Sequence, residues 1–373
     1  MSKQLSNSER FDRALITLVC VLLMACVVLL VWPQASMAEE AAMISPTTGL
    51  ETDTPYRPVL VSISFVKEAR PSWNLSEADI IYESIFWGPV HTRLLALYND
   101  NYPDKVGRVR GIRQYNAELQ QAWDAAILHF GGQDSPGTSI YDFFAQHLEE
   151  KGLSIDGVRQ STLTHGIFLR DQAYISPHNA YVDVNAAVGS RWPTDPETGE
   201  AYESRPPAMV FSDTPTLGSE EAQTIDLLYD EDVYHVTYQY KEGSGQYVRW
   251  QSGKPQLDGI TGKRIACANV IVQCHDQYFA EHEPSRPVIH TTGAGPMTAY
   301  IEGTRVEGIW IRPRMEDPIQ YYDLDGNVIE FARGKTFVQM VPPHMYHYDG
   351  SAEDVYSNEL WYWTPPVEAQ TES

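Results

Sequence analysis

The sequence predicts an α+β fold in which helices and strands mix in the first half and strands dominate the second half. Short apolar, β-branched runs and two helical segments occupy the chain before residue 190, whereas strand patterns bounded by turn residues prevail after it. The regular strand–helix–strand alternation of a doubly wound parallel sheet is absent. With 373 residues, of which 43% are hydrophobic and 21% charged, the chain is long enough for two or three packed domains.

Apolar runs and helix caps predict the elements of the first half. The run at 59–65 (VLVSISF) alternates and is rich in β-branched residues, as expected of a strand. The helix expected at 140–151 has Thr138 or Ser139 as its cap and Gly152 as its stop. The other elements expected here are strands at 93–98 and 125–130 and a helix at 114–123.

Strand patterns predict the second half. A hairpin is expected where 234–240 and 246–251 flank a glycine-containing loop at 241–245. Further strands are predicted at 268–274, 305–311 and 337–341, with turns at Asp258-Gly259 and Asp325-Gly326.

Changes in composition divide the chain into six parts. The strongest internal boundary is a polar, proline-rich stretch between residues 191 and 208. We expect an N-terminal membrane anchor or signal segment at 1–38, a linker at 39–57, an N-terminal α/β domain at 58–190, a linker at 191–208, a C-terminal β-rich domain at 209–348 and an acidic tail at 349–373.

The N-terminal segment predicts export of the rest of the chain. Residues 14–32 carry no charge, and a helix of that length spans about 28 Å, close to the thickness of a bilayer core. An uncleaved single membrane anchor is the first expectation. The alternatives are cleavage near Ala38, after a small-x-small site, and lipid attachment at Cys26 within a lipobox-like LMAC. All three place the body outside the cytoplasm, with this segment as its only membrane contact.

Charge and motif content exclude several classes of function. The net charge of −23 disfavours binding to nucleic acid phosphates, and four cysteines are too few for a disulfide scaffold. The sequence holds no HExxH, no CxxC pair, no phosphate loop and no G-x-S-x-G elbow. We therefore expect neither a metal nor a cofactor.

The stretch at 107–113 (GRVRGIR) carries the clearest chemical signal. In an extended segment Arg108 and Arg110 point to one face, and Arg113 follows three residues later. Arginine forks bind carboxylates and phosphates, so these side chains could form an anion pocket. The alternative is that they pair with the chain's own surplus carboxylates.

A second polar cluster follows in the loop after Arg170. His178 and Asn179 come directly after a proline, which places them in a turn or loop, where functional residues are common. Arg93 lies at an expected strand end, another common location for site residues.

Several motifs occur in the order seen in one bacterial family. They are 45–50 (SPTTGL), 69–71 (ARP), 75–83 (LSEADIIYE), 107–113, 177–179 (PHN), 258–262 (DGITG), 269–273 (NVIVQ) and 334–342 (GKTFVQMVP). In this order the chain resembles the YerB-like lipoproteins. The resemblance implies an envelope-facing bacterial protein with N- and C-terminal parts, no assigned activity, and a layered sandwich of mixed sheets with helices outside. Gly111 and Ile112 stand where the family usually has small residues.

Three functions remain open. The first is a membrane-tethered extracytoplasmic binding module that holds an anionic envelope ligand or a peptide carboxylate. Its ligand-binding residues would be Arg93, Arg108, Arg110, Arg113, Arg170, His178 and Asn179. The second is an envelope-acting hydrolase or transferase with His129, His165 or His178 as general base. The third is a scaffold that binds a protein partner through the C-terminal domain.

Overall fold

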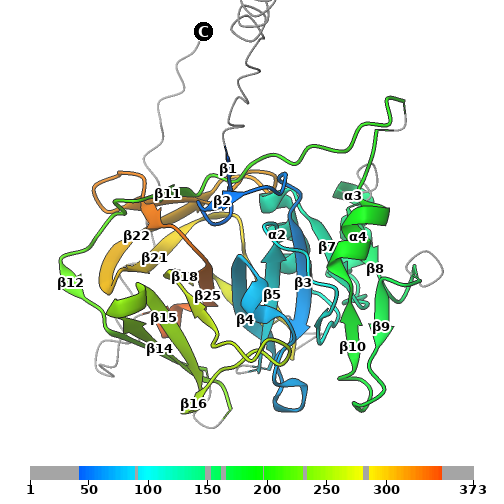
Figure 1. Ribbon diagram of the computed structural model, residues 1–373, viewed down its shortest axis with the longest axis horizontal. Helices are drawn as coiled ribbons and strands as arrows, with labels where there is room; N and C mark the ends of the chain where they lie inside the picture. Colours follow the sequence, from blue (N-terminus) through cyan, green and yellow to red (C-terminus); the bar gives the residue numbers. More distant parts are fainter. Residues whose placement is uncertain are drawn as a thin grey trace, which may run out of the picture. The chain divides into compact units, whose positions relative to one another are not determined.

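An eleven-stranded mixed sheet takes strands from both halves of the chain (Figure 1). The computed structural model describes residues 42–88, 91–147, 153–160, 165–195, 197–229, 233–279 and 285–346. The predicted anchor or signal segment at 1–38 and the predicted tail at 349–373 lie outside these ranges. Within them, no helix combines the length and apolar character needed to cross a membrane.

The long sheet connects the two halves through one parallel strand. In spatial order its strands are β12 (Glu220–Glu221), β22 (Thr304–Arg312), β21 (Gly293–Ile301), β18 (Asn269–Cys274), β25 (Thr336–Val341), β4 (Ile80–Trp87), β5 (His91–Tyr98), β3 (Val59–Ser64), β7 (Ala126–His129) and β8 (Ser154–Asp156), and β23 (Gln320–Asp323) pairs with β22. β25 runs parallel to both β18 and β4. The boundary predicted at 191–208 stays a prediction, and the sheet contains strands from both sides of it.

Side chains alternate between two hydrophobic cores along the central strands. On β3, Val59, Val61 and Ile63 belong to one core, whereas Leu60 belongs to the core on the opposite face. Because both faces are covered, every residue of β3 is buried. The long sheet is therefore an inner layer rather than a surface.

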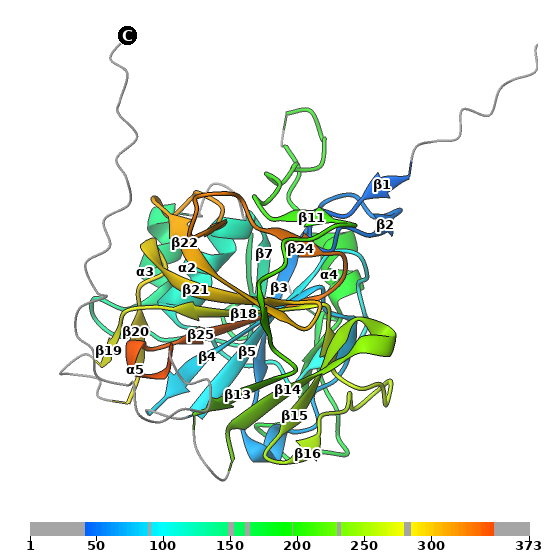
Figure 2. The ribbon, with the colours of Figure 1, turned by 90° about the vertical axis from the view of Figure 1, so that its left-hand side faces the viewer.

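Smaller sheets and helices cover these two faces. The core that holds Val59 also contains residues of the five-stranded sheet β13 (Thr224–Leu228), β14 (His235–Lys241), β15 (Gln246–Gln251), β16 (Lys254–Pro255) and β17 (Ala266–Cys267), of the three-stranded sheet β6 (Val106–Gly107), β10 (Ala180–Val182) and β9 (Phe168–Arg170), and of α4 (Val184–Arg191). The core that holds Leu60 contains residues of α2 (Gln114–Trp123) and the start of α3 (Ile140–His147). Figure 2 shows α2 and α3 on one side of β4 and β25, and β13, β14 and β15 on the other.

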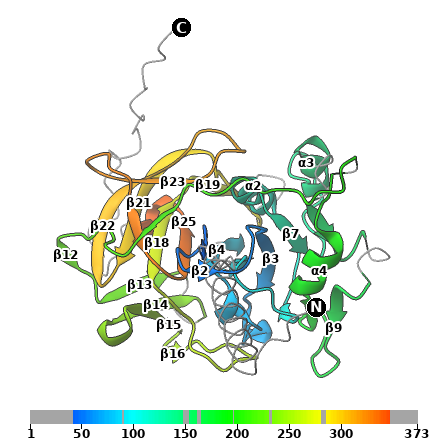
Figure 3. The same ribbon diagram turned by 45° about the horizontal axis from the view of Figure 1, so that its top comes forward.

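Figures 1 and 3 place the five-stranded sheet near β18 and β25, and α4 and β9 near β7. The remaining elements are the pairs β1 (Met43–Ile44) with β2 (Glu51–Thr52), β11 (Val210–Ser212) with β24 (Glu330–Ala332), and β19 (Gln277–Phe279) with β20 (Pro287–Ile289), the helix α5 (Pro343–Tyr346), and 3-10 turns at Lys67–Ala69, Leu75–Glu77 and Glu242–Ser244.

The α+β expectation is confirmed, with mixed sheets and few helices in the described ranges. The helix predicted at 114–123 coincides with α2, and the hairpin predicted in the second half is β14 with β15. Two long strands, β4 and β21, were not predicted. Glu83 interrupts the apolar run of β4, and β21 contains two glycines and a proline, which are rare inside strands.

A buried ion pair joins the long sheet to the five-stranded sheet. Arg249 on β15 places Nη2 2.5 Å from Oε2 of Glu83 on β4, and both side chains are fully buried. Thr92 donates to the other Glu83 oxygen at 2.7 Å, and Gln339 donates to Oε2 at 3.0 Å. Burial opposes the positive charge of Arg249, but the Glu83 carboxylate outweighs it and raises the pKa of the guanidinium. The two layers are therefore linked by a fully paired polar contact.

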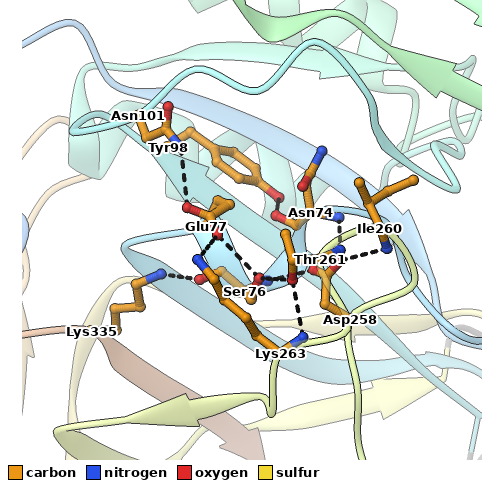
Figure 4. Close-up of polar contacts among 10 residues, drawn as sticks. All are labelled: Asn74, Ser76, Glu77, Tyr98, Asn101, Asp258, Ile260, Thr261, Lys263 and Lys335. Carbon is orange, nitrogen blue, oxygen red and sulfur yellow. Dashed lines mark hydrogen bonds and ion pairs between the residues drawn. The ribbon is translucent and has the colours of Figure 1, made fainter.

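A second polar contact joins the two halves near residue 76 (Figure 4). The Asp258 carboxylate, 3% exposed, accepts hydrogen bonds from Asn74 N at 3.2 Å and Ser76 N at 2.9 Å. It also accepts from Ile260 N at 2.8 Å and Thr261 N at 3.0 Å within its own turn. We call this carboxylate and its four donors the Asp258 clasp. It connects the DGITG motif to the start of the LSEADIIYE motif.

The buried Asp79 carboxyl predicts a pH-dependent stability. Its Oδ2 accepts from Thr47 Oγ1 at 2.9 Å, Asn99 N at 2.8 Å and Asp100 N at 3.1 Å. Burial, and then the nearby Asp100 carboxylate, raise the pKa of Asp79 to about 7. In the unfolded chain this carboxyl titrates near pH ~4, so between these values the folded state binds the additional proton. This contribution to the free energy of unfolding should therefore decrease as pH rises from about 4 to about 7, by up to about 4 kcal/mol.

Urea denaturation of the wild type and of Asp79→Asn across this pH range measures the effect. The free energy of unfolding of the Asp79→Asn variant should not show this decrease with rising pH, because the amide does not titrate. An unchanged pH dependence in the variant would show that Asp79 does not titrate in this window.

Candidate functional site

Backbone hydrogen bonds hold the arginine-rich segment at 107–113 on both of its edges. Arg110 N donates to the Ser62 carbonyl of β3 at 2.9 Å, and Val109 N donates to the Ala180 carbonyl of β10 at 2.9 Å. The segment is therefore extended between the long sheet and the strand that follows the His178 loop, as its residue pattern predicts.

The glycines at its ends allow close backbone approach. A Cβ at Gly107 would lie 3.0 Å from the Ala180 carbonyl oxygen, and one at Gly111 would lie 3.0 Å from the Gly131 carbonyl oxygen. Both distances are tighter than ordinary contacts, so a side chain at either position would push neighbouring backbone away.

Arg108 is enclosed by protein groups and is 1% exposed. Its guanidinium carbon lies 4.3 Å from the ring centre of Trp73 and 3.8 Å from that of Tyr174. Its Nη1 donates to the His178 carbonyl at 2.6 Å. Burial lowers the pKa of Arg108. This arginine holds the loop at 171–179 against the body, and its side chain does not face solvent.

Arg93 and Arg113 both lie over the Phe86 ring. Their guanidinium carbons are 3.2 Å and 4.0 Å from its centre. Arg93 Nη1 donates to the Gly111 carbonyl at 2.7 Å. Burial, and then the nearby Arg113 and Arg110, lower the pKa of Arg93 well below its ordinary value. The three guanidinium groups are thus close enough to repel one another.

Arg110 extends this group toward the His178 loop. Its Nη1 donates to the Pro177 carbonyl at 3.5 Å, and burial together with the neighbouring Arg170 lowers its pKa. Burial, and then Arg110, lower the pKa of His178 as well. Arg170 donates to Oδ1 of Asn179 at 2.8 Å, and Asn179 is buried, so its amide positions Arg170.

We call Arg93, Arg110, Arg113 and Arg170 the arginine cluster. In the part of the chain that the structure describes, Arg93, Arg110 and Arg170 form no ion pair with a carboxylate. Arg93 and Arg110 are half-buried and Arg170 is exposed. In a chain with a net charge of −23, Arg93, Arg110 and Arg170 are held near one another with no carboxylate partner among the described residues, an arrangement that favours binding of an anion.

The three histidines named as general bases occupy different surroundings. His129 is fully buried, with Nδ1 2.8 Å from the Gly131 carbonyl and Nε2 3.1 Å from Ser154 Oγ. Both of its ring nitrogens therefore form hydrogen bonds within the fold. His165 is exposed. His178 lies beside the arginine cluster, and its buried Nδ1 has no hydrogen-bond partner among the described residues.

Cysteine and metal chemistry have little basis in the described ranges. No group of three or more His, Cys, Asp or Glu residues there is placed to hold a metal ion. Cys267 and Cys274 are buried free thiols, and burial raises the pKa of each to about 12. Thiols with such pKa values are not nucleophiles at neutral pH.

The aromatic rings at the site were missed by the sequence analysis. Trp73, Tyr174 and Phe86 each lie within 4.5 Å of an arginine guanidinium. Trp73 and Tyr174 are far from Arg108 in the sequence, so no periodicity connects them with it.

Two family models and a relative of known structure match this chain. Residues 47–192 match the N-terminal domain of a family of proteins of unknown function, DUF3048, and residues 225–338 match its C-terminal domain. The chain is 26% identical over 305 residues to the "Putative lipoprotein YerB" of Bacillus subtilis (strain 168), which covers 80% of this chain and 86% of that protein. The chain belongs to the YerB-like family. The crystal structure of the YerB protein from Bacillus subtilis superposes with a TM-score of 0.65 at 26% identity, over 80% of this chain and 96% of that one.

The resemblance drawn from the motifs is therefore confirmed. In this YerB-like chain the arginine cluster lies wholly within the N-terminal family domain. The Asp258 clasp and the Glu83–Arg249 pair each connect that domain to the C-terminal one.

Proposed function

We propose that this YerB-like protein is an extracytoplasmic, membrane-associated binding protein whose arginine cluster holds an anionic envelope ligand. The name of the Bacillus relative supports the location, and it favours lipid attachment at Cys26 over the uncleaved anchor at 14–32. Both positions lie outside the described residues.

The unpaired guanidinium groups are the observation that carries the proposal. Arg93, Arg110 and Arg170 have no carboxylate partner in the described ranges, although acidic residues outnumber basic ones by 50 to 27. Like charges held together destabilise the free protein, and a bound phosphate or carboxylate would remove that repulsion. Arg108, Arg113 and Asn179 are left out of the contact surface because all three are buried. Arg108 supports the loop, and Asn179 positions Arg170.

Two guanidinium groups can bind one anion by donating four hydrogen bonds to it. The ligand class is therefore a phosphate or carboxylate group displayed on a larger envelope component. Since the protein as a whole is acidic, long-range attraction is absent and affinity has to come from contact within the cluster.

The test measures binding of poly(glycerol phosphate) and of D-alanyl-D-alanine to the full-length chain in detergent by calorimetry. Arg110→Ala should weaken binding of the preferred probe by about 10- to 100-fold, because a hydrogen bond to a charged group contributes about 1.5–3 kcal/mol.

Arg314→Ala is the matched control. Arg314 is exposed and pairs with Asp317 at 2.7 Å, outside the cluster, so its loss should leave affinity unchanged. Equal binding by wild type and Arg110→Ala, or equal losses in the two variants, would contradict the site.

A further inference from the structure

A cavity of about 410 Å³ lies between the two family domains, apart from the arginine cluster. Its size falls within the range of pockets that bind small molecules, and such pockets often occur where domains meet. The lining residues are Phe65, Lys67, Arg70, Pro71 and Ser72 from the first half and Val233, Gln251, Ser252, Lys254, Pro255, Gln256 and Leu257 from the second.

Arg70 provides a fixed cation in this lining. Its Nε donates to the Phe65 carbonyl at 2.9 Å and its Nη1 donates to the Val233 carbonyl at 3.1 Å. The guanidinium carbon lies 4.4 Å from the centre of the Phe65 ring. These contacts orient the group while Nη2, buried, has no hydrogen-bond partner among the described residues.

Three more buried polar atoms in the same lining lack partners in the described ranges. They are the Ser72 hydroxyl, the side-chain amide oxygen (Oε1) of Gln251 and the Ser252 hydroxyl. Ser72 is 2% exposed and Gln251 is 7% exposed. Buried polar groups are seldom left unpaired in native proteins, and four such atoms around one cavity indicate that something else satisfies them.

The remaining lining adds charge at the rim and apolar surface. Lys67 and Lys254 are exposed, whereas Phe65 is buried. Among the described residues, no Asp or Glu lines the cavity. The wall thus combines an arginine and two lysines with hydroxyl and amide groups, which is the mixture that recognises a polyhydroxylated anion.

We propose that this cavity binds a small saccharide that carries a phosphate or carboxylate group. Arg70, with Lys254 at the rim, contacts the anionic group. Ser72, Gln251 and Ser252 contact sugar hydroxyls, and Phe65 and Pro255 contribute apolar surface. The site needs neither the proposed function of the arginine cluster nor its ligand.

Calorimetry and saturation-transfer NMR on the full-length chain in detergent test this, with glucose 1-phosphate, glucuronic acid, glucose and inorganic phosphate as probes. One of the two charged sugars should bind at least 10-fold more tightly than both glucose and inorganic phosphate. Preference for glucose 1-phosphate or for glucuronic acid identifies which anionic group the site takes. If inorganic phosphate binds as tightly, or if none of the four binds, the saccharide site is excluded.

Variants locate the binding. Arg70→Gln removes the fixed cation and should weaken binding of the charged sugar by at least 10-fold. Lys254→Glu changes an exposed side chain at the rim, where a substitution should leave the fold intact. It should weaken binding of the charged sugar by about 3- to 10-fold. Lys241→Glu makes the same charge change on an exposed residue of the same five-stranded sheet, outside the lining, and should have no effect. Arg110→Ala should also have no effect, which separates this site from the arginine cluster. Equal affinity in Lys254→Glu, Lys241→Glu and wild type would overturn the assignment.

Discussion

Replacing Arg249 with methionine should lower the free energy of unfolding by about 3–5 kcal/mol. The substitution keeps an unbranched apolar side chain of similar length but leaves the Glu83 carboxylate buried without its cation. Thr92 and Gln339 would still donate to that carboxylate, so it stays hydrogen-bonded but not neutralised. A buried carboxylate in this situation is driven to take up a proton.

That response predicts a pH dependence with a definite sign. Without Arg249, a charged carboxylate buried at this position costs more than a neutral one, so the variant is destabilised most where carboxylates are charged in the unfolded chain. Stability of the variant should therefore fall as pH rises, and its deficit relative to wild type should be larger at pH ~8 than at pH ~5. Urea denaturation at the two pH values measures the deficit.

The double variant Glu83→Gln/Arg249→Met tests whether charge is responsible. It removes both ions together, and replacing a whole buried pair is far less costly than breaking one. We expect the double variant to be more stable than the sum of the single variants predicts, by about 2 kcal/mol or more. Additive losses would show that packing around Arg249, rather than its pairing, stabilises the contact.

Replacing Asp258 with alanine should lower the free energy of unfolding by about 3 kcal/mol or more. The carboxylate accepts from four backbone N–H groups, and a buried donor left without an acceptor, as Asn74 N would be, costs about 1–3 kcal/mol. Two of these donors, Asn74 and Ser76, belong to the first half of the chain. The variant should thus loosen the contact between the halves as well as its own turn.

Asp258→Asn offers a graded comparison. Its single amide oxygen can still accept from some of the four N–H groups, so we expect a smaller loss in the free energy of unfolding than for alanine. Asp325→Ala is the control, since Asp325 lies at the exposed Asp325-Gly326 turn, and its effect should stay within about 0.5 kcal/mol. Chemical denaturation measures all three. A loss at Asp258 no larger than at Asp325 would contradict the role of the clasp.

The elements predicted best are those whose signal is local. The helix predicted at 114–123 coincides with α2, and a helix is determined by residues a few positions apart. β3 was predicted from seven consecutive residues. β4 was missed because Glu83 breaks its apolar pattern, and this charge is acceptable only because Arg249 meets it from another sheet.

The candidate site shows the same division. The arginines at 107–113 stand out in an acidic sequence, which made them the first hypothesis. The sequence offered no means of separating Arg108, enclosed by Trp73 and Tyr174, from Arg110, which is half-buried and has no carboxylate partner in the described ranges. The sequence shows which residues are charged, but the burial of a side chain depends on the residues that pack around it in the fold.

The amino-acid sequence alone established the α+β class, eight of the strands, the helices α2 and α3, the kinship with YerB-like proteins and the clustering of arginine at 107–113. Tertiary structure decided that β25 lies beside β4, that Glu83 meets Arg249 across 166 residues of chain, and that residues 65–72 and 251–257 share a cavity. Helices and strands follow from periodicity and caps, which residues close in sequence determine. Contacts between distant residues depend on strand order, and a side chain's charge or size does not specify which partner it will meet.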